Sequence, residues 1–356
     1  MTPSSKTNKA SSMRRSKKSS LSSKNAPPLY KAPPSPFVRR FIKRVLNTVN
    51  KFELWHTGDS FIVCVSGGPD SLCLLDVLTL LQKKQNFTFH IAHVNYHLRG
   101  KDSDLDEKLV KARAKNYSLP CTVLSQEKKL QDTSEEKLRD IRYIFFEKLR
   151  TKKNADHIVI AHNQDDQAET FLMRLLRGSG LSGLSAMRPK NGSIIRPLIE
   201  MSRSDILQYL KDRGITFRED KSNADPRYFR NKVRRELIPF LEEKFQPQTR
   251  KLLAETAILL GEDYAVLSDI PTKLPLKQEA FSVECSRRVL LKLPTALIHQ
   301  EIRSLLRPFL DGKNPNKNLI NELMKAIKST KSKTQTLTFR GLKFIRNGDR
   351  VRLLNF

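Results

Sequence analysis

The 356-residue sequence has few of the features on which membrane proteins, secreted proteins and zinc proteins depend. No apolar run approaches the roughly 18 residues that a membrane span needs, and the N-terminus has no apolar segment typical of a signal peptide. The four cysteines are dispersed, with no CxxC spacing to indicate a zinc site or a redox pair. We therefore expect a protein without membrane segments, working in a reducing compartment such as the cytoplasm.

Acidic residues are missing from residues 1–36, which contain eight Lys or Arg and many Ser and Pro. Such a segment has too little apolar surface to offset the entropy lost on ordering, so we expect a disordered basic tail. Its composition also resembles organellar transit peptides, which leaves import as an alternative. The other 320 residues still carry +21 of the formal +29. That charge indicates a polyanionic partner such as nucleic acid or, alternatively, a solvated basic surface.

Apolar, β-branched runs alternate with helical stretches in the first half of the chain. The runs that fit buried parallel strands are Phe61–Val65, Phe89–Val94, Cys121–Leu124 and Ile158–Ala161. The helical stretches are Leu72–Leu81, Asp104–Tyr117 and Glu135–Leu149. A capping-box pattern, Thr133 with Glu136, precedes the last of them. This order predicts an α/β domain with an open, mostly parallel sheet and helices on both faces.

The segment SGGPDS, residues 66–71, follows the first predicted strand and precedes a helix expected to begin at about Ser71. Two glycines allow backbone conformations closed to other residues, so that N–H groups can converge on an anion. The helix N-terminus and the serine hydroxyls favour phosphate, and Asp70 then fits as a magnesium ligand. The lysine of a Walker-type loop is missing. A plain strand-to-helix connection is the alternative.

A second polar segment, AHNQDDQAETFLMRLLRGSG at residues 161–180, follows the last predicted strand. His162, Asp166 and Glu169 are spaced i, i+4 and i+7, so a helix would place them on one face. These groups could hold magnesium, an ammonium group or both. Alternatively, the acids complement the dipole at a helix N-terminus.

Basic and aromatic residues are interleaved between Arg227 and Arg235, where five basic residues accompany Tyr228 and Phe229. Arginine forks bind phosphates and aromatic rings stack on bases, so this segment fits RNA or the ATP triphosphate. A solvated helix face is the alternative. Residues 251–330 are typical of amphipathic helices, and the last residues predict short strands with an Asn347-Gly348 hairpin turn.

Taken together, these segments resemble the tRNA(Ile)-lysidine synthetases of the PP-loop ATP pyrophosphatase superfamily. SGGPDS matches the family loop SGGxDS, and the segment from residue 162 matches HxxDDQAETxLxRLLRGSGxxGL. HVNYHLRG at 93–100, EEKLRDIRY at 135–143 and DKSNADPRYFRNKVRRELIPFL at 220–241 are similar to further family segments. The resemblance spans about residues 58–245, with departures from the usual pattern at Asn163 and at Tyr96-His97.

The resemblance implies an ATP-dependent ligase with ATP and Mg²⁺ as cofactors. Its substrates would be L-lysine and a tRNA(Ile) with a CAU anticodon. ATP would adenylate the C2 oxygen of the wobble cytidine with release of pyrophosphate, and the ε-amine of lysine would then displace AMP to give lysidine. The codon read would change from AUG to AUA, and the tRNA identity from Met to Ile.

The resemblance also implies site residues and domains. The catalytic residues would be Asp70, which binds magnesium through the ATP phosphates, Asp166 and Glu169. ATP would contact Ser66, Gly67, Gly68, Pro69, Asp70, Ser71 and His93, and the substrates would contact His162, Arg174, Arg177, Arg230, Asn231 and Arg234. The expected domains are a tail (1–36), a PP-loop catalytic domain (37–245) and a small helical and β domain that binds tRNA (246–356). The alternatives are a PP-loop enzyme that places sulfur in RNA and a non-catalytic RNA-binding module.

Overall fold

The computed structural model describes residues 34–98, 100–126, 134–218, 229–270, 277–279, 282–310, 315, 317–331, 333–339 and 341–355. The disordered tail expected at residues 1–36 therefore lies almost wholly outside the described residues. Contacts within the chain define two compact units. The first comprises residues 1–47, 55–160 and 205–219, and the second comprises residues 48–54, 161–204 and 220–356.

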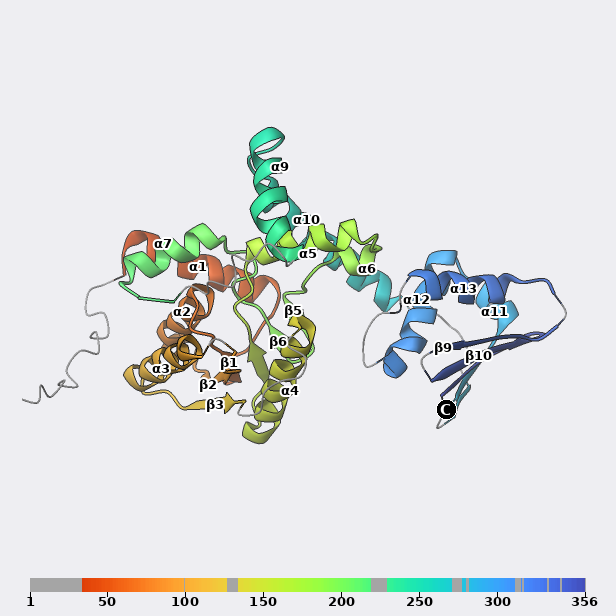
Figure 1. The fold of residues 1–356 in the computed structure, drawn as a ribbon, viewed down its shortest axis with the longest axis horizontal. Coiled ribbons are helices and arrows are strands. Elements are labelled where there is room, and N and C mark those ends of the chain that lie inside the picture. Colours follow the sequence, from red (N-terminus) through yellow and green to blue (C-terminus); the bar gives the residue numbers. More distant parts are fainter. Residues whose placement is uncertain are drawn as a thin grey trace, which may run out of the picture. The chain divides into compact units, whose positions relative to one another are not determined.

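Four strands of the first unit form a parallel sheet in the order β3-β2-β1-β4. Figure 1 labels β1, β2 and β3 of this sheet. They are β1 (Ser60–Cys64), β2 (Thr88–Asn95), β3 (Cys121–Ser125) and β4 (His157–Val159). The other two strands of this six-stranded sheet, β5 (Lys190–Asn191) and β6 (Ile194–Ile195), pair antiparallel with each other. The sheet is thus mostly parallel, as predicted, although β4 ends at Val159 and does not reach Ala161.

Helices flank this sheet, and the helix that follows β1 is the most deeply buried. The helices are α1 (Pro36–Lys51), α2 (Pro69–Gln85), α3 (Lys101–Asn116), α4 (Glu135–Lys153) and α7 (Arg203–Asp212). Along α2, Leu72, Leu74, Leu75 and Leu78 are at most 2% exposed. A helix with apolar residues on every side is held firmly by its surroundings, so α2 is a rigid support for the loop before it.

The start of α4 differs from the prediction. Ser134 is the N-cap residue, and its side chain accepts the N–H of Lys137. The expected capping box of Thr133 with Glu136 is therefore wrong by one residue, and Thr133 itself lies outside the described residues. Serine is a somewhat better N-cap than threonine, but both are favoured there over apolar residues, so neighbouring Ser and Thr are easily confused.

A buried carboxylate ties α2 to α3 and α7 within the first unit. Asp76 of α2 is 2% exposed. It accepts hydrogen bonds from the hydroxyls of Tyr117 and Tyr209 at 2.8 and 2.6 Å, and from Nε of Arg213 at 2.8 Å. A buried charge is tolerated only when it is paired and hydrogen-bonded, and these three donors satisfy that requirement.

The second unit begins with a set of packed helices. They are α5 (Gln164–Leu176), α6 (Leu181–Leu184), α8 (Phe229–Lys232), a π-helical turn (Val233–Leu237), α9 (Ile238–Lys244) and α10 (Thr249–Asp269). α5 and α6 pack against α10, and the Ser185 hydroxyl lies 3.3 Å from the Leu260 carbonyl. None of the helices in the described ranges is long and apolar enough to cross a membrane.

The C-terminal part of the second unit is an antiparallel sheet in the order β7-β8-β11-β10-β9. Figure 1 shows α11, α12 and α13 beside the strands labelled β9 and β10. Its elements are β7 (Lys277–Glu279), β8 (Ser282–Ser286), α11 (Arg287–Leu291), α12 (Thr295–Leu306), α13 (Lys317–Lys328), β9 (Gln335–Phe339), β10 (Leu342–Asn347) and β11 (Arg350–Asn355). The expected hairpin is confirmed: Asn347 lies opposite Arg350, and Gly348 between them has φ +54°. The purely helical reading of residues 251–330 is wrong, because β7 and β8 fall within it.

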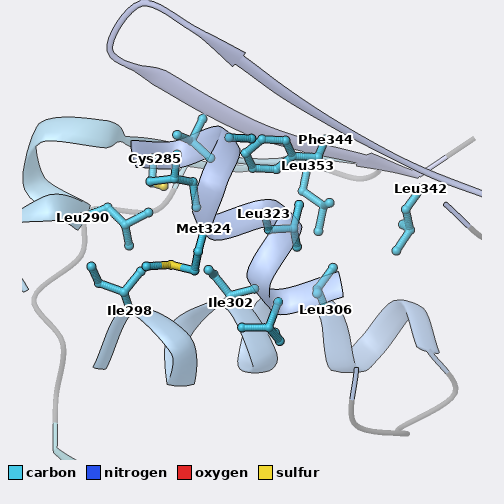
Figure 2. Packing of buried hydrophobic residues seen from close by; sticks show 14 of the residues in the cluster. Cys285, Leu290, Ile298, Ile302, Leu306, Leu323, Met324, Leu342, Phe344 and Leu353 are labelled. Carbon is cyan, nitrogen blue, oxygen red and sulfur yellow. The ribbon is translucent and has the colours of Figure 1, made fainter. Parts of the chain in front are cut away.

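This C-terminal part has its own apolar core. Figure 2 shows Ile302 and Leu306 of α12 and Met324 of α13 in the same cluster as Phe344 and Leu353 of the sheet. All five side chains are at most 7% exposed. The amphipathic pattern of the two helices is therefore explained by packing onto one face of the sheet.

Candidate active site

The loop that was predicted to bind phosphate joins β1 to α2. Gly67 has φ +93°, a conformation that L side chains rarely adopt, and a Cβ placed there would lie 3.6 Å from Cβ of Asp106. Gly68 is the N-cap residue of α2, and Pro69 and Asp70 follow in the first turn. The helix therefore begins at Pro69, two residues before the expected start, because proline fits the first helical position, where no N–H is needed.

The two serines of the loop are bonded to each other and to the backbone. The Ser71 hydroxyl donates to the Gly68 carbonyl at 2.9 Å and accepts the Ser66 N–H at 3.2 Å. The two hydroxyls are 3.2 Å apart, and the Gly68 N–H donates to Ser66 Oγ at 3.3 Å. These bonds hold the turn open at the N-terminus of α2, where backbone amides and the helix dipole favour an anion.

Arg218, which the sequence analysis did not identify, forms hydrogen bonds that stabilise the turn at Gly67. The backbone N–H of Arg218 donates to the Gly67 carbonyl at 3.3 Å. Its guanidinium donates to Asp106 at 2.7 Å and to Asp102 at 2.6 Å. The two aspartates lie one turn apart on α3, but nothing local in the sequence indicates that a residue more than a hundred positions later would pair with them.

His93 lies at the carboxyl end of β2, next to the start of this loop. Its Nδ1 is 2.7 Å from the Val65 carbonyl, so Nδ1 carries a proton and donates it. Nε2 is buried and has no hydrogen-bond partner in the described part of the chain. Burial lowers the pKa of His93 from its ordinary value of 6.5. Burial therefore favours the neutral imidazole, in which Nε2 is a hydrogen-bond acceptor.

The polar segment of the second unit is arranged differently from the prediction. Asn163 is the N-cap of α5, so His162 precedes the helix and does not share a helical face with Asp166 and Glu169. Asn163 Oδ1 accepts the Asp166 N–H at 2.9 Å, while Asp166 Oδ2 accepts the Asn163 N–H at 3.1 Å. Asp166 thus serves partly as a capping residue, and it lies in the first turn of α5, where the stated alternative placed an acid that complements the helix dipole.

Two arginines bind the carboxylates of α5. Arg230 donates from one terminal nitrogen to Asp166 and from Nε to Glu169, both at 2.7 Å. Arg234 lies one turn further along, with Nε 3.4 Å from Glu169 Oε1. Glu169 is 1% exposed, and its burial raises the pKa of the carboxyl from 4.5, an effect that Arg230 partly offsets.

The helix that carries these arginines has an irregular turn. Arg234 and Arg235 lie in the π-helical turn that separates α8 from α9. Pro239 follows in the first turn of α9, and it has no N–H to continue the α-helical hydrogen bonds. π-turns of this kind often occur at functional sites. Arg227 and Tyr228, which belong to the same sequence pattern, lie outside the described residues.

The other residues predicted to contact the substrates, Arg174, Arg177 and Asn231, each have different surroundings. Arg174 donates to the carbonyls of Gly183 and Ala186 at 2.8 and 2.7 Å, across the segment after α5. The guanidinium of Arg177 lies 5.6 Å from the centre of the Phe229 ring. Asn231 is half-buried on α8.

A brace between α5 and α10 was also not predicted. Asp165, 6% exposed, accepts a hydrogen bond from Arg250 of α10 at 2.6 Å and from the backbone N–H of Arg203 at 2.8 Å. Gln167 pairs with the backbone of Met187 in both directions, at 2.8 Å. Both side chains therefore bind within the second unit, where they connect α5 to α10 and to the segment around Met187.

Comparison with known proteins defines the class of this fold. The chain matches the PP-loop domain family over residues 38–241, and it belongs to that family. Among solved structures it is similar to the U34-tRNA thiolase of Methanococcus maripaludis, with 18% identity and a TM-score of 0.52 over 67% of this chain and 82% of that one. At that identity the likeness concerns the fold alone.

Among curated proteins, the chain is similar to tRNA(Ile)-lysidine synthases. It is 40% identical over 228 residues to that of Caldanaerobacter subterraneus subsp. tengcongensis, covering 62% of this chain and 49% of the relative. It is 36% identical over 307 residues to that of Clostridium acetobutylicum, covering 82% and 65%. The chain thus spans between about half and two thirds of the length of these relatives.

Proposed function

We propose that the protein ligates L-lysine to C2 of the wobble cytidine in a tRNA(Ile) with a CAU anticodon. ATP adenylates the C2 oxygen with release of pyrophosphate, and the ε-amine of lysine then displaces AMP. The product, lysidine, pairs with A, so the tRNA reads AUA instead of AUG and carries isoleucine. The similarity to tRNA(Ile)-lysidine synthases and the PP-loop fold support this proposal.

The loop of residues 66–71 is assigned to the phosphates of ATP. Its support is the glycine turn at the N-terminus of a buried helix, with serine hydroxyls on the same turn. Asp70, in the first turn, supplies a carboxylate for Mg²⁺, whose other ligands would be phosphate and water oxygens. Bound to ATP, this ion would neutralise charge that develops on the phosphates. His93, with its buried acceptor nitrogen, is assigned to the same nucleotide.

The observation that carries the choice of lysine is the state of Glu169. This carboxylate is almost wholly buried, and among the described residues Oε1 accepts no hydrogen bond, although Nε of Arg234 lies 3.4 Å from it. A buried carboxylate oxygen needs a strong donor, and a lysine ammonium provides one. Asp166 and Glu169 are therefore assigned to the amino groups of lysine, with Arg230 holding both side chains in place. His162, Arg174, Arg177, Asn231 and Arg234 are assigned to contacts with the substrates.

The cysteines disfavour the sulfur-transfer alternative. Burial raises the pKa of the Cys64, Cys73 and Cys121 thiols above 9.0, and that of Cys285 to about 11. The thiolate is the nucleophilic form, and all four side chains favour the thiol. The same free thiols fit a reducing compartment, and we place the reaction in the cytoplasm. The small C-terminal part is assigned to tRNA binding.

Alanine at Asp70 separates an enzyme from a passive RNA-binding module. The proposal expects Asp70→Ala to lower tRNA-dependent pyrophosphate release from ATP by about 100-fold or more, since electrostatic stabilisation is lost. Binding of the tRNA should change little. Asp59→Ala, a loop aspartate before β1, is the control for losing an acid elsewhere in the same unit. Unchanged turnover in Asp70→Ala would contradict the assignment of the loop.

A further inference from the structure

Arg196 makes an unusual contact with His162. Its Nε atom lies 2.9 Å from Nδ1 of the imidazole, and one terminal nitrogen donates to the Arg188 carbonyl at 2.7 Å. Arg196 is 4% exposed, so its side chain is held in place by the residues packed around it. The three residues belong to the second unit, and the contact is internal to that unit.

The chemistry of this contact fixes where the imidazole proton sits. A guanidinium has five N–H donors and no acceptor, and it does not lose its charge in proteins. The partner atom must therefore accept, so Nδ1 of His162 has a lone pair and no proton. In a neutral imidazole with an unprotonated Nδ1, the proton is on Nε2.

The two acids that follow His162 in the sequence, Asp165 and Asp166, accept hydrogen bonds from other donors. Asp165 is bound by Arg250 and by a backbone N–H, and Asp166 is bound by Arg230 and by the capping N–H of Asn163. The backbone of the neighbouring residue is also held, since Asn163 caps α5. The imidazole of His162 is thus positioned by Arg196 at its Nδ1 atom and by the fixed backbone of Asn163, the next residue.

We propose that Arg196 is a positioning residue that fixes His162 as the Nε2–H tautomer, so that His162 acts as a hydrogen-bond donor to a substrate oxygen and not as a base. The identity of that oxygen rests on the proposed function, whereas the tautomer does not. The inference removes His162 from the candidates for deprotonating the lysine ammonium. That proton must then be taken by another group, and the carboxylates assigned to the amino groups of lysine become the candidates.

The tautomer is measured directly by long-range proton–nitrogen NMR of the full chain with nitrogen-labelled histidine. Unprotonated and protonated imidazole nitrogens have well-separated shifts, and loss of one pattern in His162→Gln assigns the signals. We expect Nδ1 of His162 to be unprotonated and Nε2 to be protonated. A protonated Nδ1 would overturn the inference, and no substrate is needed, so this result is independent of the proposed function.

Two side-chain replacements test the donor role. The amide nitrogen of Gln can take the place of Nε2, whereas that of Asn lies closer to the place of Nδ1. If His162 donates from Nε2, His162→Gln should keep lysine transfer within about tenfold of wild type, while His162→Asn loses about 100-fold, as for a lost transition-state donor. Equal, large losses in both would indicate a base and contradict the proposal.

Replacement of Arg196 tests the positioning role. In Arg196→Met, the same NMR experiment should show His162 as a mixture of the two tautomers. Arg196→Lys keeps a charged donor, so its spectrum should contain more of the Nε2–H tautomer than that of Arg196→Met. Arg346→Met is the matched control, because Arg346 is similarly buried, at 3% exposed, and donates to a backbone carbonyl, that of Lys331. An unchanged His162 spectrum in Arg196→Met would overturn the proposal.

Discussion

Arg230 holds Glu169 at a distance of 2.7 Å between Nε and Oε2, and the carboxylate it holds is 1% exposed. The other oxygen, Oε1, lies 3.4 Å from Nε of Arg234 and accepts no hydrogen bond from the described residues. A cation that donated a hydrogen bond to Oε1 would be favoured there over a neutral molecule, because a buried carboxylate oxygen that accepts no hydrogen bond is costly.

The first prediction concerns the charge of that carboxylate. Glu169→Gln keeps the size of the side chain but removes its charge, so the KM for lysine should rise by about 10- to 100-fold, the value of one charged hydrogen bond. Pyrophosphate release from ATP without lysine should persist. Glu242→Gln, which removes an acid paired with Arg250 in the same unit, is the control. A large loss of pyrophosphate release in Glu169→Gln would contradict the assignment.

The second prediction separates backbone strain from ATP binding. Gly67 and Gly58 have similar left-handed conformations, φ +93° and +95°, and both lie in the first unit. Alanine at either position should lower the free energy of unfolding by about 1–2 kcal/mol. Only Gly67→Ala should also raise the KM for ATP, because only Gly67 lies in the phosphate loop. Denaturant unfolding measures the stability of both variants, and turnover at increasing ATP concentration measures their KM for ATP. Equal KM values for Gly67→Ala and Gly58→Ala would contradict ATP binding by the loop of residues 66–71.

The third prediction concerns the buried pair of Asp76 and Arg213, whose side chains are 2% and 8% exposed. Arg213→Met leaves a buried carboxylate without its cation and should lower the free energy of unfolding by about 3–5 kcal/mol. The double variant Asp76→Leu with Arg213→Met should recover much of that loss, since no charge remains buried. Denaturant unfolding measures both. Similar stabilities for the single variant and wild type would show that the tyrosines alone satisfy Asp76.

The fourth prediction is a pH dependence of stability that arises at His93. Its pKa is lowered by burial, so the unfolded state binds a proton more readily than the folded state once the pH falls below about 6.5. Stability should therefore fall as the pH drops from 6.5 towards the lower folded-state pKa, by at most about 1.4 kcal/mol per pH unit. His93→Gln should make this slope shallower, whereas replacement of the exposed His56 serves as control. Identical slopes in both variants would contradict the burial argument.

The local features of the fold could be predicted from the sequence, and the long-range contacts could not. The apolar runs gave the strands β1 to β4 within about two residues, because buried parallel strands are recognisable by composition. The first residues of the helices were harder to predict. α2 begins at Pro69 and not at about Ser71, and Asn163 is the N-cap of α5, so His162 lies before that helix and not on it. β7 and β8 were missed because their short segments, KQE and SVECS, have little apolar content.

The same distinction applies to the candidate site. The loop of residues 66–71 was recognisable, because glycine, serine and a following apolar run are adjacent in the chain. Arg218 on Asp106, Arg250 on Asp165 and Arg196 on His162 were not, because each pair is separated by more than thirty positions and the sequence is rich in arginine. With so many cations available, only the three-dimensional structure shows which of them holds which acid or imidazole.

The most direct measurement is lysine transfer itself. Purified protein is incubated with ATP, Mg²⁺, radiolabelled L-lysine and an unmodified tRNA(Ile) with a CAU anticodon, and the label retained on the RNA is counted. We expect lysine-dependent labelling that disappears when the wobble cytidine is replaced by uridine. Absence of labelling, with tRNA-dependent pyrophosphate release still present, would contradict lysine as the nucleophile while leaving the adenylating loop in place.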